Sequence, residues 1–172
     1  MARAPVRRGF RRRMRGLRTG RVVRWLLRAP VALYSARAGW LLGHRFLLLR
    51  HRGRRSHRLY GTVLEVVAWR PAACEAVVMS GLGPGSQWYR NVLAGQAVEV
   101  QIARLRFTPS VRPLDTDEAV GVLADYERRN RIAVPIVRAV LSKLAGFRYD
   151  GSAAARRRLV HALPLVALRP RA

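Results

Sequence analysis

Residues 47–67 read LLLRHRGRRSHRLYGTVLEVV, and this stretch decides the fold that we expect. Two apolar runs flank a polar segment at 52–58 that contains one glycine, one serine and four arginines. Such a pattern is typical of two strands joined by a turn. The second run, 59–67, is apolar on both faces, which predicts a central strand of the sheet.

The same reasoning extends outward along the chain. Alternation and β-branched residues predict strands at Phe46–His51, Leu59–Val67, Glu75–Ser80, Ala97–Ile102, Leu105–Pro113 and Leu165–Arg169, the last of which is expected to close the sheet. Helical patterns and capping residues predict helices at Ser86–Ala94, Asp115–Arg129, Ala133–Ala145 and Ser152–Ala162. Short strands followed by late helices indicate an α+β fold, a small β-barrel with peripheral helices.

The positive charge is concentrated towards the N-terminus. The 172 residues include 34 basic and nine acidic ones, for a net charge of +25, and the first acid is Glu65. The composition of residues 1–20 predicts a disordered basic tail, because arginines and glycines are combined there with few large apolar groups. Residues 21–172 predict a single domain that begins with a basic helix at 21–38.

This charge narrows the classes of partner. A strongly basic chain attracts nucleic acid, an anionic membrane surface or an anionic ligand. Helix 21–38 carries Arg, Trp and Leu at helical spacing, so it either packs on the domain or lies on a membrane surface. Nucleic acid is disfavoured, because the strands carry mainly Val and Leu rather than aromatic side chains. The single cysteine, Cys74, excludes an internal disulfide, and no metal-ligand spacing occurs.

Two segments have the composition of a site for an anionic, planar ligand. In 53–58 the arginines offer forked donors that match phosphate or carboxylate oxygens. In 80–91, SGLGPGSQWYRN, a strand leads into a glycine-rich loop and a helix start beside two aromatic residues. The plainer interpretations are a solvated basic turn and aromatic side chains that belong to the core. No GxSxG, GxGxxG or P-loop motif is present, and no catalytic residue is assigned.

Taken together, the motifs resemble the deazaflavin-dependent nitroreductase family of small actinobacterial-type oxidoreductases. The shared pattern is GRRS at 53–56, then VVMSGLGPGSQWYRNVLAG at 77–95 and AVEVQI at 97–102. Later segments, GFRYDGS at 146–152 and LPLVALRP at 163–170, also fit it. The chain departs from the pattern at His57, where the family has glycine, at Leu59-Tyr60, where many members have Pro-Arg, and at Leu82, where many have lysine.

The resemblance implies a split β-barrel that binds the 8-hydroxy-5-deazaflavin coenzyme, coenzyme F420, with its phosphate and oligoglutamate tail. It implies a phosphate and tail site at Arg54, Arg55 and Ser56, with Arg58 replacing the missing cation. The ring edge would be lined by Thr62, Val63 and Leu64, with backbone contacts from Met79, Ser80 and Gly81 and a pocket wall of Trp88, Tyr89 and Asn91. The implied reaction is hydride transfer to a small lipophilic or electron-poor acceptor, such as a quinone or nitro compound.

Several alternatives stay open at this stage. Flavin mononucleotide is the alternative cofactor, and a non-enzymatic module that binds a membrane or nucleic acid is the alternative function. A homodimer is considered, and the expected location is cytoplasmic, with peripheral attachment at the inner membrane face. Tyr60, Tyr126 and Tyr149 are candidates for substrate contact or proton donation. Glu65 should lie at the barrel rim or pair with an arginine, because an unpaired buried carboxylate is costly.

Overall fold

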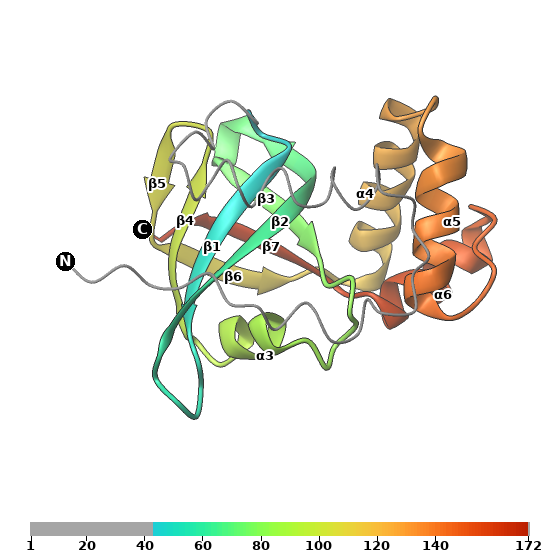
Figure 1. Cartoon of the computed structure of the whole chain (residues 1–172). Coiled ribbons are helices and arrows are strands. Elements are labelled where there is room, and N and C mark those ends of the chain that lie inside the picture. Colours follow the sequence, from blue (N-terminus) through green and yellow to red (C-terminus); the bar gives the residue numbers. More distant parts are fainter. Residues whose placement is uncertain (1–42, 172) are drawn as a thin grey trace, which may run out of the picture.

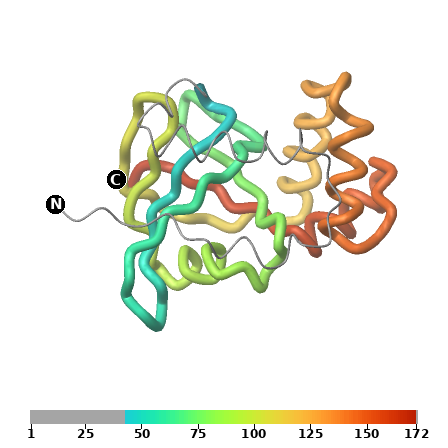
Figure 2. Tube along the Cα trace, viewed as in Figure 1, coloured from blue at the N-terminus to red at the C-terminus, as the bar shows by residue number. Residues whose placement is uncertain are grey.

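The structure, a computed structural model, describes residues 43–171, so the predicted tail 1–20 and helix 21–38 lie outside the described residues. Figures 1 and 2 show a curled sheet on one side and three helices on the other. The strands are β1 (Phe46–Arg52), β2 (Leu59–Arg70), β3 (Glu75–Met79), β4 (Ala97–Ile102), β5 (Leu105–Phe107), β6 (Pro109–Pro113) and β7 (Leu165–Pro170). The helices are η4 (Pro71–Ala73), α3 (Gln87–Leu93), α4 (Thr116–Arg129), α5 (Val134–Ala145) and α6 (Ala153–Ala162).

The seven strands form one sheet in the order β5-β4-β1-β2-β3-β7-β6, with every neighbouring pair antiparallel. Strand β2 pairs with β1 through its first half and with β3 through its second half. The register shifts between Val66 and Ala68, and such an irregularity bends a strand and increases its twist. The two ends of the sheet therefore come together at β4 and β6, and the result is a nearly closed split β-barrel of the expected α+β class.

Two apolar clusters lie on opposite faces of this sheet. One fills the barrel, with Leu47, Leu49 and Val100 among its fully buried members. The other lies between the sheet and helices α4, α5 and α6. Strand β7 shows the division, because Val166 faces the barrel cluster and Leu165 the helical one. Both faces of the middle strands are thus buried, as the continuous apolar runs predicted.

The four helices expected after residue 85 are confirmed, and the starts of two of them follow from capping residues. Asp115 accepts a hydrogen bond from the Glu118 backbone N–H at 2.8 Å, and Ser152 caps α6 in the same way through Ala155. The Glu118 side chain does not return to the helix start. It pairs instead with Arg112 at 2.6 Å and Arg70 at 2.8 Å, which ties α4 to strands β6 and β2.

Two predictions about strands are wrong. Residues 105–113 do not form one strand, because the extended run breaks at Thr108, whose carbonyl accepts from Arg171 N–H at 3.0 Å. The two halves pair with different partners, β5 with β4 and β6 with β7, so they stand at opposite ends of the sheet. Strand β7 does not close the sheet but lies between β3 and β6.

A buried carboxylate holds the three long helices together. Glu127 on α4 is 4% exposed and accepts from Arg138 of α5 at 3.0 Å and from Arg156 of α6 at 2.6 Å. Burial raises the pKa of Glu127, but the hydrogen bonds from these two arginines outweigh burial, and the net pKa is lowered. The carboxylate is therefore ionised at neutral pH and bridges all three helices.

We expect Glu127→Gln to lower the free energy of unfolding by about 1–3 kcal/mol, because it leaves two arginines without their carboxylate. Urea denaturation at pH 7 measures this. The matched control is Asp125→Asn, which removes the exposed pair between Asp125 and Arg128 and should cost no more than about 0.5 kcal/mol. Equal losses for the two variants would contradict the role of the buried bridge.

The Glu118 cluster predicts an acid-sensitive stability. Hydrogen bonding to Arg112 lowers the pKa of Glu118 to about 2, against the opposing effect of burial, and Arg70 adds to the lowering. A carboxyl with a lowered folded-state pKa contributes stability that is complete above its unfolded value and is lost as the pH falls through the folded value. The melting temperature of the native chain should therefore fall more steeply than that of Glu118→Gln between pH 4.5 and about 2. Parallel curves in this window would refute the assignment.

Candidate functional site

The turn between β1 and β2 is tightly folded. Gly53 N–H donates to the Arg58 carbonyl at 2.9 Å, and His57 N–H donates to the Gly53 carbonyl at 2.8 Å. Gly53 is buried, and a Cβ there would lie 2.9 Å from a ring carbon of Tyr60. Only glycine permits this approach. The Ser56 hydroxyl lies 3.1 Å from the Tyr60 hydroxyl, so it is directed back at the hairpin.

The departure from the family pattern at His57 has a backbone consequence. His57 has a φ of +52°, in the left-handed region that favours glycine. The family pattern places glycine at this position, and the structure shows the conformation that such a glycine would adopt without strain. The hairpin keeps this geometry here although a side chain is present.

A polar network joins this hairpin to helix α3. The Asn91 side-chain carbonyl accepts from Arg54 twice, from its backbone N–H at 3.2 Å and from its Nη1 at 3.1 Å. The same guanidinium donates to Gln87 Oε1 at 3.0 Å. On its other side the Asn91 amide lies 3.1 Å from Nδ1 of His51, on strand β1. Arg54 and Asn91, which the sequence assigned to different parts of the site, are therefore direct partners.

The protonation of His51 follows from this network. The ring is 3% exposed, and burial lowers its pKa, partly opposed by a backbone hydrogen bond at Arg52. The imidazole is therefore neutral at pH 7. Because the Asn91 carbonyl faces Arg54, its NH₂ donates to Nδ1, and the ring proton lies on Nε2, 3.4 Å from the Thr62 hydroxyl.

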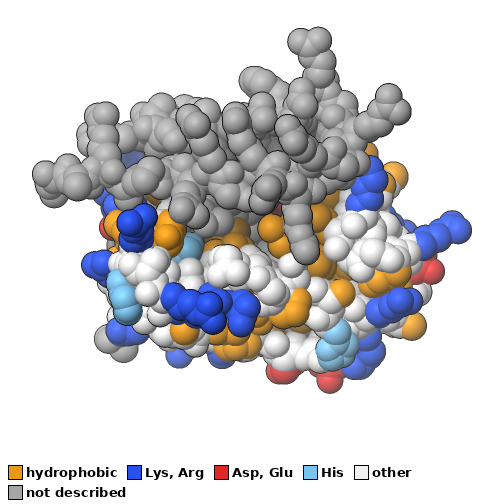
Figure 3. Space-filling view, turned by 60° about the horizontal axis from the view of Figure 1, so that its bottom comes forward, with side chains coloured by type: hydrophobic (Ala, Val, Ile, Leu, Met, Phe, Trp, Pro, Cys, Tyr) orange, Lys and Arg blue, Asp and Glu red, His pale blue; other side chains and the backbone are white. Residues whose placement is uncertain are grey.

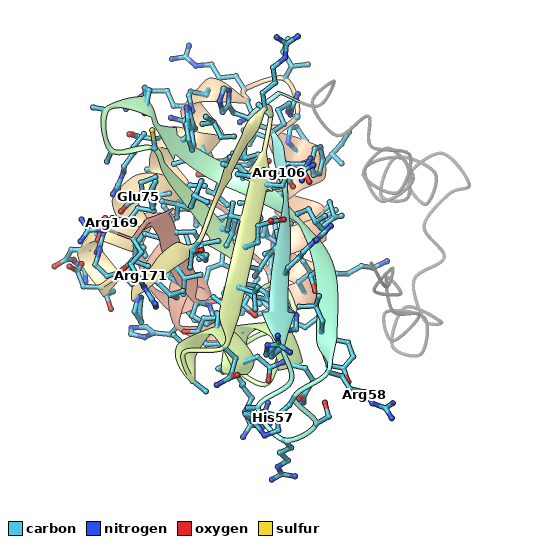
Figure 4. The ribbon with its side chains drawn as sticks, turned by 90° about the vertical axis from the view of Figure 1, so that its left-hand side faces the viewer. His57, Arg58, Glu75, Arg106, Arg169 and Arg171 are labelled. Atoms are coloured by element: carbon cyan, nitrogen blue, oxygen red, sulfur yellow. The ribbon has the colours of Figure 1, made fainter. Side chains whose placement is uncertain are left out.

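Two arginines of the hairpin are left available. Arg55 and Arg58 are exposed and make no ion pair or side-chain hydrogen bond with another residue in the described range 43–171. Figure 4 shows Arg58 directed away from the barrel at the hairpin tip, beside His57, and Figure 3 shows basic side chains at several places on the face turned forward. The structure thus separates a positioning cation, Arg54, from two cations that can receive an anion.

The glycine-rich loop after β3 is closed by its own hydrogen bonds. The Ser80 hydroxyl, fully buried, donates to the Gly83 carbonyl at 2.7 Å, and Ser80 N–H donates to the Pro164 carbonyl at 2.8 Å. Gly81 N–H donates to the Met79 carbonyl at 3.1 Å. The amides of Ser80 and Gly81 are engaged, so a contact from this loop to a ring would use other backbone atoms. The cofactor role of Met79, Ser80 and Gly81 stays a prediction.

The remaining predicted site residues do not all face one space. On β2, Leu64 packs towards the barrel interior and Thr62 shares its face, whereas Val63 lies on the opposite face. Trp88 is half-buried, and its ring meets Tyr89 edge to face with centroids 5.8 Å apart. Tyr89 is buried and lines a cavity of about 170 Å³ between α3 and the helical layer, with Leu114, Asp115, Thr116, Ala119, Val160, His161, Pro164 and Leu165.

Sequence reasoning missed His51 and Gln87 as parts of the network. Alternation along β1 was the available signal, because it puts His51 on the same face as the buried Leu47 and Leu49. A histidine on an apolar face needs hydrogen-bond partners. Nothing in the sequence indicated Gln87, which stands on an exposed helix turn.

Two of the three tyrosine candidates, Tyr126 and Tyr149, lie away from the hairpin. Tyr126 donates to the Glu65 carboxylate at 2.7 Å, and burial and then the Glu65 charge raise the Tyr126 pKa. Glu65 is exposed, so it is not the unpaired buried carboxylate that would be costly, and its hydrogen-bond partner among the described residues is this tyrosine and not an arginine. Tyr149 is buried in the helical cluster, where burial raises its pKa to about 12. Tyr60 is the candidate that lies on the hairpin.

Neither a membrane-spanning helix nor a metal site is found in the described part of the chain. Within residues 43–171, no helix combines the length and apolar character needed to cross a membrane. In that same range, no three His, Cys, Asp or Glu side chains are grouped to hold a metal ion.

Solved structures similar to this chain are distant in sequence. A chain described as an F420-H2-dependent reductase is 16% identical, with a TM-score of 0.43 over 74% of this chain and 96% of that one. A protein of unknown function from Agrobacterium tumefaciens is 16% identical, with a TM-score of 0.49 over 83% and 55%. A pyridoxamine 5'-phosphate oxidase-related, FMN-binding protein from Nostoc punctiforme is 12% identical, with a TM-score of 0.39 over 85% and 80%. No protein-family model and no curated protein sequence matches the chain.

We expect Asn91→Ala to release the hairpin from α3. It removes the side-chain oxygen that accepts both hydrogen bonds from Arg54, and it removes the partner of buried His51. Amide hydrogen exchange over residues 53–58 should become faster, and the free energy of unfolding should fall by about 2 kcal/mol. Gln87→Ala, which removes only an exposed contact to Arg54, is the control and should leave exchange almost unchanged. Unchanged exchange in both variants would show that the network does not hold the hairpin.

Proposed function

We propose that this chain is an oxidoreductase that binds the reduced 8-hydroxy-5-deazaflavin coenzyme and reduces an electron-poor acceptor such as a quinone or a nitro compound. The observation that carries the proposal is the difference between Arg54, which is paired, and the two exposed arginines of the same hairpin. Arg54 is held by Asn91, while Arg55 and Arg58 project with no partner among the described residues. The family resemblance of residues 53–56 and 77–95 supports the same conclusion.

The charge pattern of the hairpin fits the anionic part of the coenzyme. Its phosphate and oligoglutamate tail carry several negative charges, and residues 50–60 contain arginines and no acid. Guanidinium groups bind phosphate and carboxylate oxygens through paired, charge-assisted hydrogen bonds. Arg55 and Arg58 would supply these bonds, while the network behind Arg54 keeps the hairpin backbone in place.

When bound, the deazaflavin would supply the hydride, and this chain would supply position and exclusion of water. Leu64 and Trp88 offer half-buried apolar surface packed against the barrel cluster, whereas Val63 lies on the other face of β2. Burial lowers the pKa of His51, so the neutral ring would act as a positioning group between Asn91 and Thr62. The proposed location is cytoplasmic or peripheral at the inner membrane face.

Flavin mononucleotide is the competing cofactor, because its single phosphate could be received by the same two guanidinium groups. The coenzyme tail distinguishes the two ligands, since its carboxylates extend the anionic contact beyond one phosphate. A non-enzymatic anion-binding module would bind neither ring. A titration of the purified chain with each cofactor, followed by cofactor fluorescence, separates these three functions.

We expect selective binding of the deazaflavin coenzyme, weakened about 30- to 1000-fold in Arg55→Ala/Arg58→Ala, because each of the two lost charge-assisted contacts is worth about 1–2 kcal/mol. The control is Arg106→Ala/Arg171→Ala, which removes the same charge from positions well away from the hairpin tip (Figure 4). If coenzyme binding weakened equally in both double variants, the effect would come from the net charge of the chain and not from the hairpin. Binding of neither cofactor by the native chain would overturn the proposal.

A further inference from the structure

The outward face of α5 is a stripe of apolar side chains. Ile136, Val140 and Leu144 follow one another at intervals of four residues and are 65%, 41% and 38% exposed. Ile132, at the corner between α4 and α5, is 100% exposed. Residues four apart on a helix lie on the same face, so Ile136, Val140 and Leu144 form one apolar row on α5. Ile132 precedes this row in the turn before the helix, and we name these four side chains the α5 stripe.

The neighbouring helices do not share this pattern. The exposed positions of α4 include Asp117 and Arg128, and those of α6 include Arg157 and Arg158. On α5, Arg138 is turned inward to Glu127, which leaves Lys143 as the charge on the exposed side. In a chain with 25% charged residues, a helix face with one cation among apolar side chains is unusual.

The stripe continues beyond the helix. A Cβ on Gly81 would lie 3.5 Å from a methyl carbon of Leu144, so the loop after β3 abuts the end of α5. The next residue in that loop, Leu82, is 45% exposed. The apolar surface therefore extends from the α4–α5 corner to this loop. Single exposed apolar residues are normal, whereas a contiguous exposed set marks a contact surface.

We propose that the α5 stripe is a docking surface for an anionic phospholipid bilayer. Figure 1 shows α5 at the outer edge of the helical layer, on the side away from β5, where a flat surface can reach it. Apolar side chains of an interfacial helix enter the boundary between headgroups and acyl chains, and cations stay at the headgroups. Lys143 on the stripe and Arg131 at its start are exposed and suit that second role.

Charge decides between a bilayer and a second copy of this chain. The described residues contain 22 basic side chains against nine acidic ones, and the whole chain carries +25. Two copies meeting at this face would bring together surfaces of the same sign. An anionic leaflet is attracted instead, by about 1 kcal/mol for each basic residue near its surface. The inference stands on the exposed face and the charge, and it does not need the proposed cofactor.

The lone cysteine allows a direct test with the full chain. Cys74→Ser provides a background in which Ile136→Cys carries an environment-sensitive nitrobenzoxadiazole label. With phosphatidylglycerol-containing vesicles we expect the label's fluorescence to rise about twofold or more and to shift to shorter wavelength, because it enters the apolar boundary. Phosphatidylcholine vesicles should give a much smaller change. The matched control carries the same label at Ala154→Cys, an exposed position on α6, and should not respond.

A second variant separates the stripe from the basic residues elsewhere in the chain. Ile136→Ser/Val140→Ser keeps every charge and changes only exposed side chains, so the fold should be retained, as a thermal melt will show. Sedimentation with phosphatidylglycerol vesicles should fall about tenfold or more, because apolar insertion is lost. Unchanged sedimentation, or a label at 136 that stays silent on bound protein, overturns the proposal. A label that responds to protein concentration without vesicles assigns the face to a second copy and also overturns it.

Discussion

Strand β2 has to serve two halves of one sheet, and the arrangement of the whole domain depends on this constraint. Its first half pairs with β1 and its second half with β3, and the register shift at Val66 and Ala68 lies between them. A flat strand would keep the two halves in one plane and leave the barrel open. The bend lets one face close around Leu47 and Leu49, while the other face becomes the platform for α4, α5 and α6.

The candidate site depends on a second constraint, the need of buried polar groups for partners. Asn91 and His51 are 4% and 3% exposed, and each satisfies the other. The side-chain oxygen of Asn91 accepts hydrogen bonds from Arg54, and this contact connects the interior to the exposed hairpin. Because Arg54 is engaged in this way, Arg55 and Arg58 are the arginines of the turn 53–58 whose side chains remain exposed to solvent. An arginine-rich turn is thus divided into a part that holds the structure and a part that stays exposed at the surface.

Charge is also used in two ways in the helical layer. Glu127 and Glu118 are each held between two arginines, and these contacts bind the helices to one another and to the sheet. The exposed side of α5 lacks such pairs and is apolar. Inward ionic contacts stabilise the layer, while the outward face stays available for a partner. A large basic excess of this kind attracts anionic molecules.

Most elements of the fold could be predicted from local sequence, because alternation in 97–102, the cap at Asp115 and the apolar run in 59–67 act over a few residues. The sequence also pointed to residues 53–58 and 80–91 through their composition. Local pattern could not separate β5 from β6, since both halves of 105–113 look extended and only their distant partners, β4 and β7, distinguish them. Nor could it show that Arg54 is paired while Arg55 has no partner among residues 43–171, or that Tyr89 lines the cavity beside the helical layer. Those outcomes depend on contacts between segments far apart in the chain, such as Arg54 and Asn91, which are 37 positions apart, so they follow from the tertiary structure and not from local pattern.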